Sequence, residues 1–300
     1  PFARYHFRPH FFQHMGFRLV VNEHSAKSVG ELPQTDAQML REGVEKYETQ
    51  KQLEEYLALH YGSEADQLPV RALPQPMAHA LRSFPSRCAT RLTLAAGDAN
   101  ASKKRALDVG CAVGGASFEL AREYDEVIGI DFSAAFVKAA ETLRTDGKLS
   151  YHLFQEGERY GPTLSATRPA DVDAARISFQ VGDACNLPVQ LGTFDAVLAA
   201  NLLCRLPAPM EFLDRLVNLV NKGGVVMFTS PFSWLTEYTP KDRWIGARND
   251  SLSSAEALNE AMQQRGFKLL EEGEETLMIR EHHRKYQFII PHVSIFQKVE

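Results

Sequence analysis

Apolar and polar positions along the chain follow two periods, one typical of buried strands and the other of amphipathic helices. The strand-like runs are Arg105–Gly110, Glu126–Asp131, Ile177–Val181, Phe194–Ala200 and Gly224–Thr229. The helix-like runs are Ala116–Tyr124, Ala134–Leu143, Pro209–Val220 and Ser254–Arg265. This alternation of strands with helices predicts an α/β fold, in which helices cover both faces of a mostly parallel sheet.

Two segments depart from that alternation. After the last helix, Lys268–Leu277 and Tyr286–Lys298 are extended runs joined by the charged stretch IREHHRK. We expect them to form an antiparallel pair that closes the edge of the sheet, with the charged stretch as their loop. Tyr151–Arg176 is longer than an ordinary connection in an α/β fold, and part of it alternates, so we expect a small hairpin inserted near residues 151–176.

The first part of the chain divides into three segments. Residues 1–21 are dense in Phe, His and Arg and resemble the end of a preceding domain, whereas residues 22–36 are polar and suit a linker. From residue 37 apolar positions recur at helical spacing, with Asp36 as the expected cap and Gly62 as the end. We therefore expect one domain over residues 37–300 that begins with a helical cap.

Composition narrows the classes of partner. The net charge of −5 and the isoelectric point near 6.1 disfavour nucleic acid, because phosphate binding needs a basic surface. No apolar run reaches the length of a membrane span, so we expect no membrane partner. The four cysteines form no C-x-x-C pair, which favours free thiols and a cytoplasmic location.

The strongest local motif is LDVGCAVGGAS, in which a strand turns into a helix. Glycines let the backbone turn tightly and approach a ligand, and the helix start offers free N–H groups. The expected ligand contacts in it are Asp108, Gly110, Cys111 and Gly114. A glycine-rich turn of this kind serves many cofactors, and a turn without a ligand stays open.

Further candidates follow the next strands. Asp131, followed by Phe132, ends the second strand, where an acidic side chain binds the ribose hydroxyls of an adenosine cofactor. Its other role is that of a helix cap, and both roles can hold together. After the third strand, Asp183 and Ala184 are expected beside the adenine, and Asn201 ends the fourth strand at the same sheet edge.

The order of these motifs resembles that of the class I S-adenosylmethionine-dependent methyltransferases, over roughly residues 82–298. Their usual motif is E/D-x-G-x-G-x-G, and here Ala112 replaces its middle glycine. The resemblance implies a Rossmann-like seven-stranded sheet, S-adenosylmethionine as cofactor and S-adenosylhomocysteine as product. The loop alone also nearly satisfies the dinucleotide motif G-x-G-x-x-G/A, but the antiparallel pair at the carboxyl end favours the methyltransferase.

Longer phrases point to a narrower family. LALHYG, ADVDAARISFQVGDACNLP and SPFSWLTEYTPKDRWIG are similar to the carboxyl-terminal half of the bifunctional enzymes of ovothiol biosynthesis. These join a 5-histidylcysteine sulfoxide synthase to a 4-mercaptohistidine N-methyltransferase, and PFARYHFRPHFFQHMGFRLV looks like the end of the synthase domain, which is similar to the formylglycine-generating enzyme. The resemblance implies methylation of an imidazole nitrogen of a thiohistidine, with the synthase upstream in the same polypeptide.

Candidates for binding a small substrate lie in segments that can cover the sheet edge. They are Tyr56, Tyr61, Trp234, Tyr238, Arg243 and Arg284. Of these, Trp234 and Tyr238 would stack on an imidazole, and Arg284 or Arg243 would hold the substrate carboxylate. Arg87 is a candidate for the methionine carboxylate of the cofactor. The alternative is that the rings only pack their loop and the arginines are solvated.

Histidines are the remaining candidates. His282 or His283 is a weak candidate for a general base. His6, His10 and His14 share a spacing of four residues but have no acidic or cysteine partner nearby, so we expect no metal. Rival interpretations are a methyltransferase for another small acceptor, a cofactor-binding module without catalysis attached to the synthase, and an NAD enzyme.

Overall fold

The computed structural model describes residues 47–67, 81–247 and 251–299, all of which belong to one compact unit, Gln38–Glu300. The expected synthase tail at 1–21, the linker at 22–36, the cap residue Asp36 and the histidines His6, His10 and His14 lie outside the described residues.

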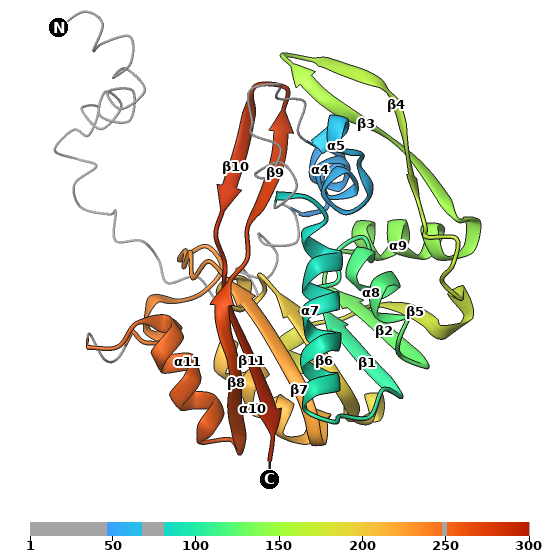
Figure 1. Cartoon of the computed structure of the whole chain (residues 1–300). Helices are drawn as coiled ribbons and strands as arrows, with labels where there is room; N and C mark the ends of the chain where they lie inside the picture. Colours follow the sequence, from blue (N-terminus) through green and yellow to red (C-terminus); the bar gives the residue numbers. More distant parts are fainter. Residues whose placement is uncertain (1–46, 68–80, 248–250, 300) are drawn as a thin grey trace, which may run out of the picture. The chain divides into compact units, whose positions relative to one another are not determined.

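A seven-stranded sheet with the strand order β5-β2-β1-β6-β7-β11-β8 forms the centre of the unit (Figure 1). Its strands are β1 (Arg105–Val109), β2 (Glu126–Asp131), β5 (Ile177–Val181), β6 (Phe194–Ala200), β7 (Val220–Ser230), β8 (Phe267–Glu274) and β11 (His292–Lys298). The first five strands of that order are parallel, and β11 runs antiparallel to both β7 and β8. The predicted α/β fold of the class I methyltransferase type is thus confirmed.

Helices cover both faces of this sheet. One face carries α7 (Phe84–Asp98), α8 (Gly115–Leu120) and α9 (Ala134–Asp146), and the other carries α10 (Pro209–Leu219) and α11 (Ser254–Gln263). Successive side chains of β6 point to opposite faces, so Leu198 packs with the α7 face and Val197 with the α10 face. The central strands are therefore apolar at most positions, as a sheet covered on both sides requires.

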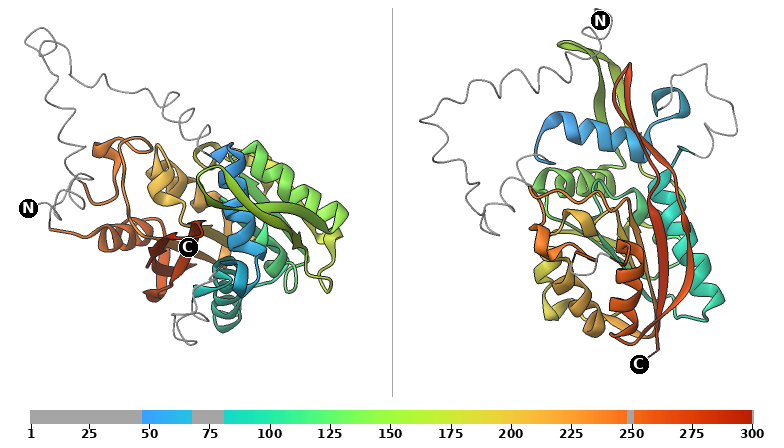
Figure 2. Two further views of the ribbon diagram at one scale, coloured as in Figure 1. Left: turned by 90° about the horizontal axis from the view of Figure 1, so that it is seen from above. Right: turned by 90° about the vertical axis from the view of Figure 1, so that its left-hand side faces the viewer.

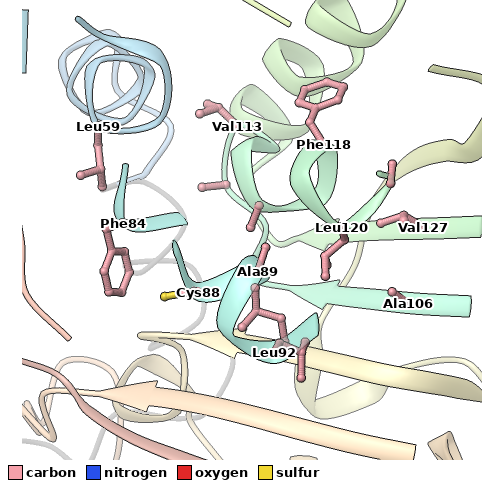
Figure 3. Close-up of a cluster of buried hydrophobic side chains, with 14 of the residues drawn as sticks. Leu59, Phe84, Cys88, Ala89, Leu92, Ala106, Val113, Phe118, Leu120 and Val127 are labelled. Atoms are coloured by element: carbon pink, nitrogen blue, oxygen red, sulfur yellow. The ribbon is translucent and has the colours of Figure 1, made fainter. Parts of the chain in front are cut away.

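The α7 face shows how the apolar spacing of a helix becomes core packing. Cys88 and Leu92, one helical turn apart, belong to the same buried cluster as Ala106 of β1 and Val127 of β2 (Figure 3). Phe118 and Leu120 of α8 fill the neighbouring space, and the side chains labelled in this view are almost fully buried. Because this face is filled, a ligand has room only at the ends of the strands.

The carboxyl-terminal strands differ from the expectation in one respect. The first expected run corresponds to β8, the second divides into β10 (Lys285–Ile289) and β11, and β9 (Leu277–His282) forms largely from the expected loop. Strands β8 and β11 join the sheet, while β9 and β10 form a separate hairpin. The expected loop IREHHRK mostly belongs to this hairpin, whose turn is limited to His283 and Arg284. Charged residues were compatible with strands here because most side chains of the hairpin are not fully buried.

A second hairpin and a helix lie beside the first. Between α9 and β5 the chain forms β3 (Lys148–Glu156) and β4 (Arg159–Thr167), a hairpin that begins and ends earlier than the expected residues 151–176. Helix α4 (Gln50–Tyr61) begins after its N-capping residue Thr49. It lies between the two hairpins and contacts β3 and β9 (Figure 2). The short helix α5 (Glu64–Gln67) follows it. We call α4, α5 and the two hairpins the cap.

Polar contacts hold the parts of the cap together. The backbone N–H of His283 donates to the carbonyl of Gln155 at 3.3 Å, which joins the two hairpins. The buried Arg280 donates to the carbonyl of Asp66 at 2.6 Å, which joins β9 to α5. The cap is therefore one assembly made of segments that lie far apart in the sequence.

The other connections contain short 3₁₀ turns, which are η3 (Ala174–Arg176), η4 (Ala184–Asn186), η5 (Val189–Leu191), η6 (Leu203–Arg205) and η7 (Lys241–Arg243). In the described part of the chain, no helix is both long enough and apolar enough to cross a membrane. Nor does any group of three or more His, Cys, Asp or Glu side chains among these residues have an arrangement that could hold a metal ion.

Candidate active site

A cavity lies at the carboxyl ends of the parallel strands, between the sheet and the cap. Its floor is formed by the segments that follow β1, β2, β5 and β6, and its roof by residues of α4 and β9. Ten residues proposed from the sequence line it, namely Tyr56, Asp108, Gly110, Cys111, Asp131, Phe132, Asp183, Ala184, Asn201 and Tyr238. The fold therefore gathers at one edge the motifs that the sequence spreads over four strands.

The glycine loop has left-handed backbone at Gly110, Ala112 and Gly114. Gly110 has φ +77°, and a Cβ there would come within 3.2 Å of the Leu202 side chain. Ala112, which occupies the position of the usual middle glycine, has φ +47°. That conformation costs a residue with a side chain about 1 kcal/mol, which explains why glycine is usual at this position and shows that alanine is accommodated.

Asp131 holds the loop and faces the cavity at the same time. Its two carboxylate oxygens accept the backbone N–H groups of Ala112 at 2.8 Å and Ser133 at 2.9 Å. A carboxylate has about four acceptor positions, so lone pairs remain for hydroxyl groups of a ligand. Burial raises the pKa of Asp131 to about 6, and the side chain is therefore mainly ionised at pH 7. The two sequence-based roles, ligand contact and start of the following helix, are compatible.

The segments after β5 and β6 complete the floor. Asp183 accepts the N–H of Cys185 at 2.8 Å, which turns the chain and leaves its other oxygen without a bond to this turn. Asn201 lies at φ +53°, held by bonds from its N–H to the Thr229 carbonyl and from the Thr229 hydroxyl to its side chain. A backbone conformation that a side chain disfavours is here fixed by two contacts with the neighbouring strand β7.

Asp108 has a different environment from Asp131. It is 2% exposed, and its partner is the hydroxyl of Ser117, which donates at 2.6 Å. Burial raises the pKa of Asp108 to about 7, so that the carboxyl titrates near neutral pH. Asp108 thereby joins the start of α8 to the end of β1 and shapes the cavity wall.

His60 lines the cavity and was not proposed from the sequence. Its Nδ1 accepts the backbone N–H of Gly115 at 3.0 Å, at the first residue of α8. Burial lowers the pKa of His60 to about 3, so the ring stays neutral and carries its proton on Nε2. The signal that could have identified it is helical spacing, since His60 follows Tyr56 by four residues on the same face of α4.

Aromatic rings form the roof of the cavity. The ring of Tyr56 lies 4.8 Å from that of Phe136, and Tyr47 meets both rings edge-on at 6.3 and 5.9 Å between centroids. Arg205 and Tyr238 stand at the same cavity, with the guanidinium carbon 4.8 Å from the ring centroid. Arg205 is another lining residue that the sequence analysis did not propose, although it lies only four residues after the candidate Asn201.

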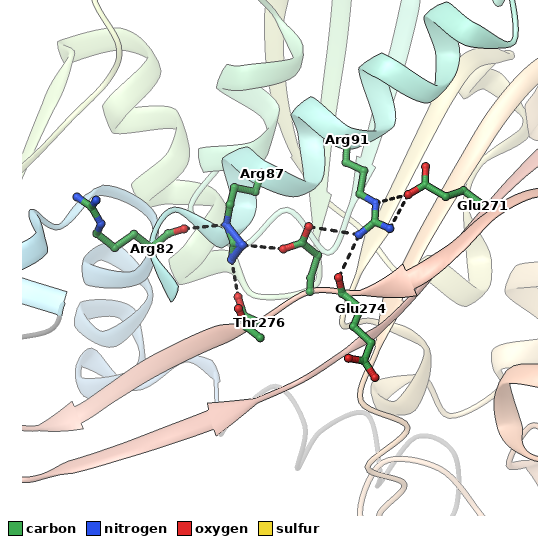
Figure 4. Close-up of polar contacts among 7 residues, drawn as sticks. Arg82, Arg87, Arg91, Glu271, Glu274 and Thr276 are labelled. Carbon is green, nitrogen blue, oxygen red and sulfur yellow. Dashed lines mark hydrogen bonds and ion pairs between the residues drawn. The ribbon is translucent and has the colours of Figure 1, made fainter. Parts of the chain in front are cut away.

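Arg87 has structural partners instead of the expected contact with the cofactor. Its guanidinium donates to the Glu275 carboxylate at 2.6 Å and to the carbonyl oxygens of Arg82 and Thr276 (Figure 4). Arg91, one turn along α7, pairs with Glu271 and Glu275 in the same way. Both arginines fasten α7 to the junction of β8 and β9, and Arg87 does not line the cavity.

Seven other proposed residues also lie away from the cavity lining, three of them in its surroundings. Gly114, at φ +85°, caps α8, and a Cβ there would come within 2.6 Å of the Phe179 ring. The Tyr61 hydroxyl donates to the carbonyl of Val113 at 2.6 Å, which braces the glycine loop from outside. Trp234 stacks on Trp244, at 6.3 Å between ring centroids, and thus packs its own loop.

The remaining four do not reach the site. Arg243 belongs to a second, separate pocket beside α11. His282, His283 and Arg284 lie at the tip of the β9–β10 hairpin, where the His282 ring meets that of Phe154 at 5.9 Å between centroids. We expected this hairpin to supply a general base or a contact with a carboxylate. Its turn instead lies away from the residues that line the cavity, and His282 packs against the β3–β4 hairpin.

The lining residues fit a bound S-adenosylmethionine. A ribose needs a carboxylate with free lone pairs at the end of β2, and Asp131 meets this requirement. The amino-acid portion of the cofactor needs a backbone that it can approach closely, and the small residues Gly110 and Ala112 line the cavity. The adenine needs an apolar slot with a polar edge, and Phe132, Asp183 and Ala184 lie together at the floor.

Comparisons with known proteins agree with this geometry. A family model described as a methyltransferase domain matches residues 77–272. Ajmaline N-methyltransferase of Rauvolfia serpentina is 27% identical over 134 residues, which are 44% of this chain and 38% of that enzyme. Tocopherol O-methyltransferase of Arabidopsis thaliana is 28% identical over 128 residues, which are 42% of this chain and 30% of that enzyme. The chain thus spans less than two fifths of the length of these relatives.

Solved structures show the same fold. The crystal structure of magnesium protoporphyrin IX methyltransferase from Synechocystis PCC 6803 with bound SAH has a TM-score of 0.52 and 12% identity, and the match covers 87% of this chain and 99% of that chain. At this identity the likeness concerns the fold. Because the family model covers more than half of the chain, the chain belongs to the methyltransferase domain family, and the domain it carries uses S-adenosylmethionine.

Proposed function

We propose that the chain transfers a methyl group from S-adenosylmethionine to an imidazole nitrogen of a thiohistidine, as in ovothiol biosynthesis. The observation that carries the proposal is that all three resembling phrases contribute residues to the lining of one cavity. LALHYG supplies Leu59 and His60, ADVDAARISFQVGDACNLP supplies Asp183, and SPFSWLTEYTPKDRWIG supplies Tyr238. Residues on which the resemblance depends therefore lie where an acceptor and a cofactor would meet.

The size and chemistry of the roof suit a small planar acceptor. Tyr47, Tyr56 and Phe136 form a cluster of rings that can stack on an imidazole and exclude water from it. Burial raises the pKa of Tyr56 well above its usual value, so its hydroxyl remains a neutral hydrogen-bond donor and acceptor. Such a roof would orient a ring without supplying charge.

The described lining residues provide no histidine that can take up a proton. His60 uses Nδ1 to accept the Gly115 N–H and has its pKa lowered to about 3. A neutral imidazole nitrogen with a free lone pair can attack a methyl group without prior loss of a proton. The chain then needs mainly to align the acceptor, which in enzymes supplies several kcal/mol or more of the barrier.

The bound cofactor would supply an electrophilic methyl group on a positively charged sulfur. Asp131 would hold the ribose, Asp183 and Ala184 the adenine, and the loop from Gly110 to Ala112 the amino-acid portion. Since the sulfur loses its charge during transfer, a carboxylate directly against it would slow the reaction. Asp131 and Asp108 instead hold backbone and hydroxyl groups of the protein itself.

The proposal is tested with the 300-residue chain in two steps. Calorimetry with S-adenosylmethionine and with a nicotinamide dinucleotide first identifies the cofactor. Release of S-adenosylhomocysteine is then measured with a thiohistidine and, as the matched control, with histidine, which lacks the sulfur. Nuclear magnetic resonance of the product shows whether nitrogen or sulfur carries the new methyl group.

The outcomes separate the candidate functions. N-methylation of the thiohistidine in preference to histidine supports the proposal. Turnover of another small amine or acid, without turnover of thiol-imidazoles, identifies a methyltransferase for a different acceptor. Binding of the cofactor without any turnover favours a non-catalytic module, and binding of the nicotinamide dinucleotide alone contradicts the methyltransferase assignment.

A further inference from the structure

The cavity has a single cationic side chain among its described lining residues. That side chain is Arg205, which belongs to η6 and follows the end of β6. The acidic residues on the lining are Asp108, Asp131 and Asp183, on the floor where the ends of β1, β2 and β5 meet. The positive and negative charges of the cavity therefore belong to different segments of its wall.

The structure fixes the position of the Arg205 guanidinium. One terminal nitrogen donates to the carbonyl oxygens of Cys204 at 3.0 Å and Ser233 at 2.9 Å. The guanidinium also lies over the ring of Tyr238 and hydrogen-bonds to the side chain of Tyr47. A cation held by four neighbours loses little further freedom when it binds a ligand.

Donor capacity remains after these contacts. A guanidinium has five N–H donors, and the bonds to carbonyl oxygens leave from one nitrogen only. None of the ion pairs formed among residues 47–67, 81–247 and 251–299 includes Arg205. Within that part of the chain, the charge is thus balanced by dipoles and aromatic faces and not by a carboxylate.

Each acidic lining residue accepts at least one hydrogen bond from the floor of the cavity. Asp108 accepts from Ser117, Asp131 accepts from two backbone N–H groups, and Asp183 accepts from Cys185. The hydroxyl of Tyr56 lies within electrostatic reach of both Asp131 and Arg205. Tyr56 therefore shares the cavity with the carboxylate that fits the ribose and with the cation.

We propose that Arg205 is the anchor for a carboxylate group of the methyl acceptor, whose ring stacks beneath Tyr56. This inference rests on the proposed function and narrows its substrate class to planar heteroaromatic compounds that bear a carboxylate. A guanidinium binds a carboxylate through two parallel hydrogen bonds, which fixes orientation as well as position. A phosphate dianion would require further cations, and the described lining offers a single one.

The test compares two acceptors that differ only in the carboxylate. Calorimetry measures the Kd of a thiohistidine and of its decarboxylated amine in the presence of S-adenosylhomocysteine, for the wild type and for Arg205→Gln. The wild type is expected to bind the carboxylate form more tightly by about 10- to 100-fold, which corresponds to the usual free energy of hydrogen bonds to charged groups. In Arg205→Gln this preference is expected to fall to less than about threefold, while the Kd for S-adenosylmethionine stays within about twofold of the wild-type value.

Two further variants separate anchoring from folding. Arg205→Lys retains the charge without the planar fork, so it is expected to keep part of the preference. Arg215→Gln removes an arginine of α10 that donates to the Leu187 carbonyl and does not line the cavity, and it should bind both acceptors like the wild type. Equal melting temperatures of the Arg205 variants and the wild type show that the fold is intact.

Two results would overturn the inference. One is a wild type that binds both acceptors equally or binds neither, and the other is an Arg205→Gln variant that keeps the preference for the carboxylate form. Because these measurements use binding and not turnover, they are distinct from failure of the proposed function. A chain that prefers the carboxylate through Arg205 but never methylates the thiohistidine would leave the anchor supported and the acceptor wrong.

Discussion

The substitution Asp131→Asn tests the ribose assignment with two measurements. In the wild type both carboxylate oxygens accept backbone N–H groups, at 2.8 and 2.9 Å, and their remaining lone pairs face the cavity. The amide nitrogen of an asparagine must meet one of these N–H donors, so the variant loses the charge and one acceptor. Hydrogen bonds to charged groups are worth about 1.5–3 kcal/mol, which corresponds to a loss of roughly 10- to 150-fold in affinity for S-adenosylmethionine.

The pH dependence gives the second measurement. Since burial raises the pKa of Asp131 to about 6, roughly nine tenths of this carboxyl is protonated at pH 5 in the absence of ligand. A cofactor that binds the ionised form must therefore bind about tenfold more weakly at pH 5 than at pH 7.5. In Asp131→Asn this component is absent, so the Kd should change less over the same range.

Calorimetry at several pH values from 5 to 8 measures both effects. The matched control is Glu126→Gln, at the exposed amino end of the same strand, where the side chain pairs with Arg105 away from the cavity. We expect this control to bind S-adenosylmethionine like the wild type. If Asp131→Asn keeps the wild-type Kd at pH 7.5, or shows the same tenfold loss at pH 5, Asp131 does not hold the ribose.

Other substitutions probe stability. Burial raises the pKa of Glu55 from 4.5 to about 7, so its stabilising contribution is complete below pH 4.5 and is lost as the pH rises through 7. Glu55→Gln should therefore raise the free energy of unfolding by up to about 3 kcal/mol more at pH 8 than at pH 5, and a difference that does not vary with pH would contradict this. Gly129→Ala places a Cβ 2.6 Å from the Phe179 ring and should lower the free energy of unfolding by about 1–3 kcal/mol. Gly97→Ala, in α7 with no atom within 4 Å of the new Cβ, should raise it by about 0.5–1 kcal/mol; denaturant unfolding with effects of the same sign would refute the packing argument. Arg87→Gln should lower the melting temperature without changing the Kd for S-adenosylmethionine, whereas a weakened Kd would restore its expected role at the cofactor.

The sequence alone predicted those features that depend on neighbours along the chain. Three short segments are examples: the strand that contains Asp108, the glycine turn after it, and the end of the next strand at Asp131. Parallel strands bring their carboxyl ends to one edge, so the order of such segments was enough to place Asp183 and Asn201 beside them. For this reason the α/β fold is the one that the sequence predicted. Most of the residues that were expected at the cofactor also line the cavity.

The tertiary structure decided which side chains reach the cavity from elsewhere. Arg87 was expected at the cofactor, but its carboxylate partner Glu275 lies 188 residues away in the sequence. His282 and Arg284 were expected over the site, yet the terminal segment forms four strands, and the turn of the β9–β10 hairpin lies away from the cavity lining. Conversely, His60 and Arg205 line the cavity because α4 and η6 are held against the sheet edge by contacts that no local pattern contains. Local periodicity specifies which elements form, whereas the direction of a side chain across a cavity depends on packing between distant segments.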